Sequence, residues 1–136
     1  VKTKKESNIY VKISSEYQLE KIPNKDLELI VVSVKLDLLE GRSLHDMIVE
    51  IIDLIDKKHG DLYLLHHALS QKKLTVENLI EYNNYKYTVT KTESFDAGHE
   101  NFPRLNVSNI DSEISSLKYK LRVTNLDEYL IKEIIK

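Results

Sequence analysis

The sequence has no cysteine and only three glycines and two prolines among its 136 residues. Without cysteine it can form neither a disulfide nor a thiolate metal site, and a reducing, intracellular location, nuclear or cytoplasmic, is the resulting expectation. Its glycines, Gly41, Gly60 and Gly98, are isolated from one another. A loop that cradles phosphate needs clustered glycines, so that backbone N–H groups can approach the ligand. The usual nucleotide-binding loops are therefore excluded.

Long hydrophobic runs and a strong excess of one charge are also absent. No window approaches 18 uncharged apolar residues, so we expect no membrane-spanning helix and no membrane partner. The formal net charge is −2, so any binding to nucleic acid has to depend on a local patch. The length is that of one domain. We expect a polar lead-in over residues 1–7 and a single domain over residues 8–136.

The clearest predicted element is a helix over residues 43–59. Ser43 and Asp46 form a variant of the capping box, and apolar residues then recur at helical spacing from Leu44 to Ile55. Lys57, Lys58 and His59 complement the negative end of the helix dipole, and Gly60 is suited to the residue after the helix.

Hydrophobic periodicity predicts the remaining elements. For residues 27–39 we favour a helix over a strand, although the β-branched run from Ile30 to Val32 favours the strand. The other predictions are a strand at 8–14, helices at 61–73 and 75–83, a hairpin with strands at 85–92 and 101–108, a helix passing into a strand over 109–123, and a last helix capped by Thr124.

Residues that could carry chemistry are few. His66 and His67 are adjacent, so they point about 100° apart on a helix. His59 lies seven residues before His66, which corresponds to about 10 Å along a helix axis. The sequence therefore predicts no metal site, no cofactor and no catalytic residue. An enzyme centred on the turn Asp96–Glu100, whose two carboxylates and His99 could seat a general base or a loosely held metal, is an alternative.

Two groups of side chains are candidate binding surfaces. Tyr82, Tyr85 and Tyr87 cluster where the helix at 75–83 meets a strand, and tyrosine suits a protein interface as well as a core. Basic residues on predicted strands could contact phosphate, or they could form the solvated side of an edge strand. These residues are Lys86, Lys91, Lys118, Lys120 and Arg122.

The order of the predicted elements resembles the winged-helix superfamily. Three helices followed by a hairpin run from Ser43 to about Ser108, and the phrase LTVENLIEY is similar to the turn and third helix of such domains. The resemblance implies an α+β, mainly helical fold: a winged-helix-like core of three helices plus a β-hairpin, with extra N- and C-terminal elements. It also implies either DNA binding or protein association, including the dimerising modules of chromatin and silencing factors.

The charge of the third predicted helix favours the second of these functions. Residues 76–84 include Glu77 and Glu81 but no lysine or arginine, and DNA would repel two uncompensated carboxylates. The prediction is a non-catalytic module that binds a protein partner or forms a homodimer, within a larger, DNA-associated protein. The alternative is a winged-helix domain that binds nucleic acid through the five basic residues.

Overall fold

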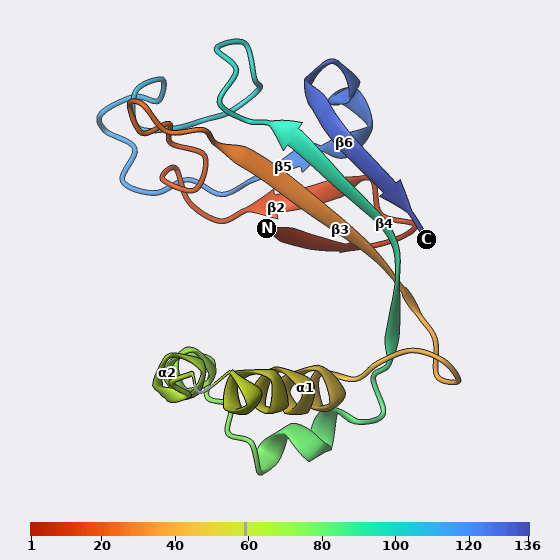
Figure 1. Cartoon of the computed structure of the whole chain (residues 1–136). Helices are drawn as coiled ribbons and strands as arrows, with labels where there is room; N and C mark the ends of the chain where they lie inside the picture. The colour runs from red at the N-terminus through yellow and green to blue at the C-terminus, as the bar shows by residue number, and fades with distance from the viewer. Residues whose placement is uncertain (59) are drawn as a thin grey trace. The chain divides into compact units, whose positions relative to one another are not determined.

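The computed structural model describes residues 1–58 and 60–136, and the chain divides into two compact units (Figure 1). Unit 1 comprises Val1–Lys35 and Val89–Lys136, and unit 2 comprises Leu36–Thr88. His59, at the end of a predicted helix, lies outside the described residues. None of the helices in the described part of the chain is long and apolar enough to cross a membrane. The predicted boundary between residues 1–7 and 8–136 stays a prediction.

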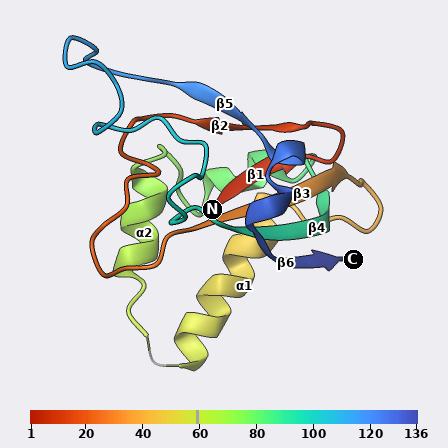
Figure 2. The same cartoon turned by 90° about the horizontal axis from the view of Figure 1, so that it is seen from above.

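Unit 1 is built from strands. A mixed sheet has the order β1-β3-β4-β6, in which β1 and β3 are parallel and β4 and β6 are antiparallel. A separate antiparallel pair consists of β2 and β5, which lie side by side in Figure 2. The strands are β1 (Lys2–Lys5), β2 (Tyr10–Ile13), β3 (Glu28–Leu36), β4 (Tyr87–Asp96), β5 (Tyr119–Arg122) and β6 (Leu130–Ile135), with short 3-10 turns η2 (Val123–Asn125) and η3 (Asp127–Tyr129) before β6.

The core of unit 1 takes side chains from both sheets. Along β3 the buried positions alternate with half-buried ones, as expected for a strand that has one face against a core. The pair β2 and β5 contributes one face in the same way. The buried members of this core include Val11, Ile13, Leu29, Val31, Phe95, Leu121 and Val123.

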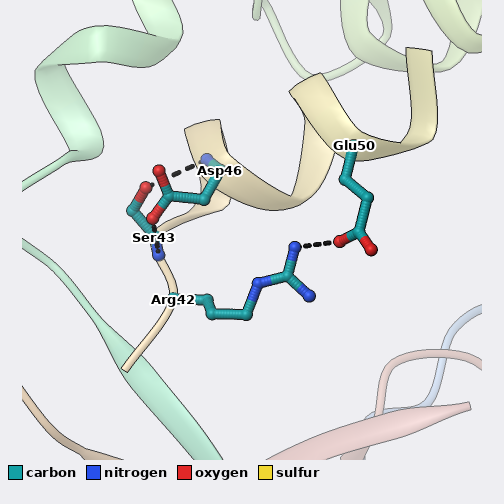
Figure 3. Close-up of polar contacts among 4 residues, drawn as sticks. All are labelled: Arg42, Ser43, Asp46 and Glu50. Atoms are coloured by element: carbon teal, nitrogen blue, oxygen red, sulfur yellow. Dashed lines mark hydrogen bonds and ion pairs between the residues drawn. The ribbon is translucent and has the colours of Figure 1, made fainter. Parts of the chain in front are cut away.

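Unit 2 contains α1 (Leu44–Lys57), α2 (Tyr63–Ser70) and the 3-10 helix η1 (Asn78–Tyr82). The predicted cap of α1 is confirmed: the Asp46 N–H donates to Ser43 Oγ, and the Ser43 N–H donates to an Asp46 carboxylate oxygen (Figure 3). Arg42, which precedes the cap, forms an ion pair with Glu50. A small core of Ile48, Leu69 and Leu79 joins the three elements.

The mainly helical, winged-helix fold class is wrong. The described residues form two α-helices and six strands in mixed sheets, not a bundle of three helices with a wing. Thr75 does cap the turn that follows it, because its Oγ1 accepts from the Asn78 N–H. However, the helix predicted at 75–83 is only the short 3-10 helix η1. The predicted third helix therefore lacks the length of a recognition helix.

Other segments were also misassigned, and the clearest case has a periodicity that suits two structures. The segment 27–39 forms strand β3, so the β-branched run from Ile30 to Val32 outweighed the helical spacing. The C-terminal segment forms η2, η3 and strand β6 in place of the helix capped by Thr124. Residues 101–108 form no strand, and residues 109–117 form no helix. The strands predicted around β2, β4 and β5 are confirmed.

Candidate functional site

A half-buried lysine lies at the start of the mixed sheet. Lys2 is in β1, where it is paired in parallel register with Val31 of β3, a fully buried core residue. Alternation along β1 leaves Lys2 half-buried, whereas Thr3 and Lys5 are exposed. Burial lowers the pKa of Lys2 from its ordinary value, because desolvation disfavours the charged ammonium. This strand therefore holds a cation beside the core face of the sheet.

Gln18 holds that lysine in place. The Lys2 Nζ donates to Gln18 Oε1 at 2.7 Å, and the Ser14 N–H donates to the same oxygen at 2.9 Å. Because the partner is a neutral amide, the positive charge of Lys2 is oriented without being cancelled. No salt bridge to Lys2 occurs in residues 1–58 and 60–136. The arrangement suits a role toward an anion.

The turn Asp96–Glu100, proposed as an alternative catalytic site, contains side chains that hydrogen-bond to its own backbone. A cavity of about 370 Å³ adjoins the turn and is lined by Asp96, His99 and Glu100, together with Lys21 and Lys25. Asp96 Oδ1 accepts from the Gly98 N–H, and His99 Nδ1 accepts from the Asn101 N–H. These bonds shape the turn and occupy Asp96 Oδ1 and His99 Nδ1. Within the described residues, no group of three His, Cys, Asp or Glu side chains could hold a metal.

The predicted tyrosine surface lies in and next to unit 2's 3-10 helix. Tyr82 and Tyr85 are 40% and 58% exposed, so neither belongs to a core. Tyr87 is half-buried and pairs with Arg42 through an isolated β-bridge. The surface is accessible to a protein, and its use as an interface stays a prediction.

The five basic residues proposed to contact phosphate do not form one surface. Lys86 belongs to unit 2, whereas Lys91 of β4 is bound by Glu93 at 2.8 Å and Glu133 at 2.5 Å, so its charge is already neutralised. Lys120 and Arg122 point outward from β5, and Lys118 is exposed just before that strand. The structure thus keeps only the residues around β5 together.

Two further residues belong with Lys120 and Arg122. Tyr10 is paired with Arg122, and Lys12 is paired with Lys120, across the β2 and β5 ladder. The alternation along residues 8–14 placed Tyr10 and Lys12 on the polar face of a strand. Nothing local in the sequence indicated that this strand would pair with one more than 100 residues later.

Comparison with known proteins identifies the family. A family model described as "Putative PD-(D/E)XK family member, (DUF4420)" matches residues 1–124. The chain belongs to this family. No curated protein and no solved structure matches it. Membership in DUF4420 overturns the winged-helix resemblance, and with it the dimerising, chromatin-associated and non-catalytic interpretation that the resemblance supported.

The motif in the family's name is only partly present in residues 1–136. No proline is followed by aspartate, since Pro23 precedes Asn24 and Pro103 precedes Arg104. The pattern Asp/Glu-any-Lys occurs once, at Asp56-Lys57-Lys58. That triplet lies at the end of α1. Residues two apart are about 200° apart on a helix but share one face of a strand, so the triplet cannot present its acid and lysine together.

Proposed function

We propose that this chain is part of a nuclease of the PD-(D/E)XK type and that Lys2 is the lysine of its motif. The supporting observation is that Lys2 lies on a strand of the mixed sheet, half-buried and held by Gln18. Lys2 differs from the exposed lysines of the strands because it is half-buried and hydrogen-bonded to a neutral amide.

The chemistry of phosphodiester cleavage suits such a lysine. Negative charge grows on the phosphate oxygens in the transition state, and a preorganised cation stabilises it best where water is partly excluded. The lowered pKa of Lys2 also eases transfer of its proton to the leaving oxygen as the bond from phosphorus to that oxygen breaks. Gln18 is a positioning residue, because its amide oxygen fixes the ammonium group.

A divalent metal supplies charge neutralisation and an activated water in many nucleases. The described residues do not fit such an ion by themselves, because they contain no group of three potential ligands. The proposal therefore assigns to this chain the lysine of the site and its orientation by Gln18, and no step that passes through a metal.

The test compares two substitutions in β1. In the full polypeptide, supplied with Mg²⁺ and duplex DNA, Lys2→Ala should lower the cleavage rate about 100-fold or more, as loss of a preorganised transition-state group does. The matched control is Lys5→Ala, which removes an exposed lysine from the same strand. Cleavage at the unaltered rate by folded Lys2→Ala protein would overturn the proposal.

A further inference from the structure

We propose that the outward face of β2 and β5 binds the phosphate backbone of duplex DNA. This basic face consists of Tyr10, Lys12, Lys120 and Arg122. The choice of DNA over other polyanions as the ligand rests on the proposed function. The face itself is defined independently of Lys2.

The pairing of the two strands creates the face. Strands β2 and β5 run side by side (Figure 2). In their antiparallel register Tyr10 lies opposite Arg122 and Lys12 lies opposite Lys120. Val11 and Leu121, which alternate with them, are 2% and 7% exposed and belong to the core of unit 1. Lys12, Lys120 and Arg122 are exposed. Three cations therefore project from one side of a strand pair whose other side is buried.

The charges of this face are not balanced within the described chain. Like charges directly opposite each other across a ladder are destabilising, and Lys12 faces Lys120. None of the salt bridges formed by the described residues involves Lys12, Lys120 or Arg122. The formal net charge of the chain is −2, so the concentration of cations is local and not a consequence of a generally basic protein. A polyanion would relieve the repulsion.

The aromatic ring between the cations keeps them available to phosphate. The Arg122 guanidinium lies 5.5 Å from the centroid of the Tyr10 ring and donates to its hydroxyl at 3.1 Å, and the Lys120 Nζ lies 6.0 Å from the same centroid. Contacts of this kind orient a cation without neutralising it. Arg122 can then offer its remaining donors to a phosphate in a fork, and the two lysines can add point charges. Duplex DNA presents one charge per roughly 1.7 Å of axis, which matches such a cluster.

The experiment measures binding with cleavage suppressed. In the full polypeptide with chelator and no divalent metal, fluorescence anisotropy follows the affinity for duplex DNA across a range of salt concentrations. The variant carries Lys12→Ala, Lys120→Ala and Arg122→Ala. Each lost phosphate contact reduces the slope of log affinity against log salt by about 0.9, so we expect a reduction of about 3 and an affinity at least tenfold lower.

Two controls make the result specific. Lys35→Ala, Lys72→Ala and Lys132→Ala remove the same charge from exposed lysines elsewhere and should leave the slope nearly unchanged. Lys12→Arg with Lys120→Arg keeps the charge and should keep the affinity. An unchanged slope in the basic-face variant would overturn the inference, even if Lys2→Ala abolishes cleavage. DNA binding that depends on the face in a protein that never cleaves DNA would instead overturn the proposed function alone.

Discussion

Unit 1 and unit 2 are stabilised over very different distances along the chain. Unit 2 is one continuous segment, and its helix α1 begins with bonds between residues three apart, Ser43 and Asp46. Unit 1 is assembled from two distant segments, and its β2 strand pairs with β5, so that Tyr10 lies opposite Arg122. The difference shows that one short chain combines a locally encoded part with a part that exists only once distant strands have paired.

The two units also differ in how much core supports them. Among residues 1–58 and 60–136, twelve buried residues form the core of unit 1, whereas three form the core of unit 2. Lys2 and the basic face both belong to unit 1. A binding or catalytic group needs a rigid support, and the larger core provides that support where the candidate functional residues lie.

Removing a core side chain from each unit should produce the largest effects. Phe95 is 1% exposed in unit 1, and Leu79 is fully buried in unit 2. Phe95→Ala should lower the free energy of unfolding by about 3–5 kcal/mol, and Leu79→Ala should lower it by about 2–5 kcal/mol. Amide hydrogen exchange should show the loss of protection mainly in the strands for Phe95→Ala, and mainly in α1 and α2 for Leu79→Ala.

The exposed residue Leu39 offers a matched control, because Leu39→Ala should change the protection of neither core. If either core substitution reduced exchange protection equally in both units, the difference in stability that we infer between unit 1 and unit 2 would be wrong. The chain would then unfold as a single cooperative body, and the local origin of unit 2 would not make it separately stable.

The difference between local and long-range contacts also explains which elements could be predicted from the sequence. The cap at Ser43 and the stripe of α1 depend on neighbours within one helical turn, and both are confirmed. In β3 the residues from Ile30 to Val32 suit a helix face and a strand alike, and only pairing with β1 and β4 decides between them. The helix predicted at 75–83 had a correct cap at Thr75, yet a cap does not determine how far a helix continues.

The candidate site was harder to predict for two separate reasons. Lys2 has no recognisable motif around it, so its half-buried place on the sheet is visible only in the structure. Its hydrogen-bond partner, Gln18, reaches it through the fold of the loop after β2. The basic face was found in part, because Lys120 and Arg122 follow from alternation along one strand. Lys12 and Tyr10 join them through a long-range pairing that no local pattern reports.

Loss of the α1 cap should have an intermediate effect, confined to unit 2. Ser43 is fully buried, accepts from the Asp46 N–H and donates to Asn83 Oδ1 at 3.2 Å. Ser43→Ala should lower the free energy of unfolding by about 1 kcal/mol, measured by denaturant unfolding. Ser112→Ala, at an exposed serine of unit 1, should be nearly neutral. An exchange profile in which Ser43→Ala loosens the strands of unit 1 as much as α1 would contradict the local role of the cap.

The smallest predicted effect is a difference between the two units in how acid lowers their stability. Backbone hydrogen bonds, with further side-chain bonds, lower the pKa values of Asp37 and Asp46 in unit 2 from their ordinary values. A carboxyl whose pKa is lower in the folded state stabilises the fold above its unfolded pKa, which is about 3.9 for Asp. That contribution is lost as the pH falls from this value through the folded pKa.

In unit 1 the Lys91 ammonium has a raised pKa, because Glu133 and Glu93 accept from it, so its own proton is lost only as the pH rises through that pKa. Hydrogen bonds with Glu113 lower the pKa of Asp111, which is also in unit 1 but lies in the loop before β5 and not in a strand. We therefore expect amides of α1 to lose exchange protection before those of β3 as the pH is lowered below about 4. Both aspartates are solvent-accessible, so the difference should be small and should shrink in high salt. Asp37→Asn with Asp46→Asn should bring the acid profiles of the two units together, and unchanged profiles in that variant would show that other carboxylates determine the acid limit of unit 2.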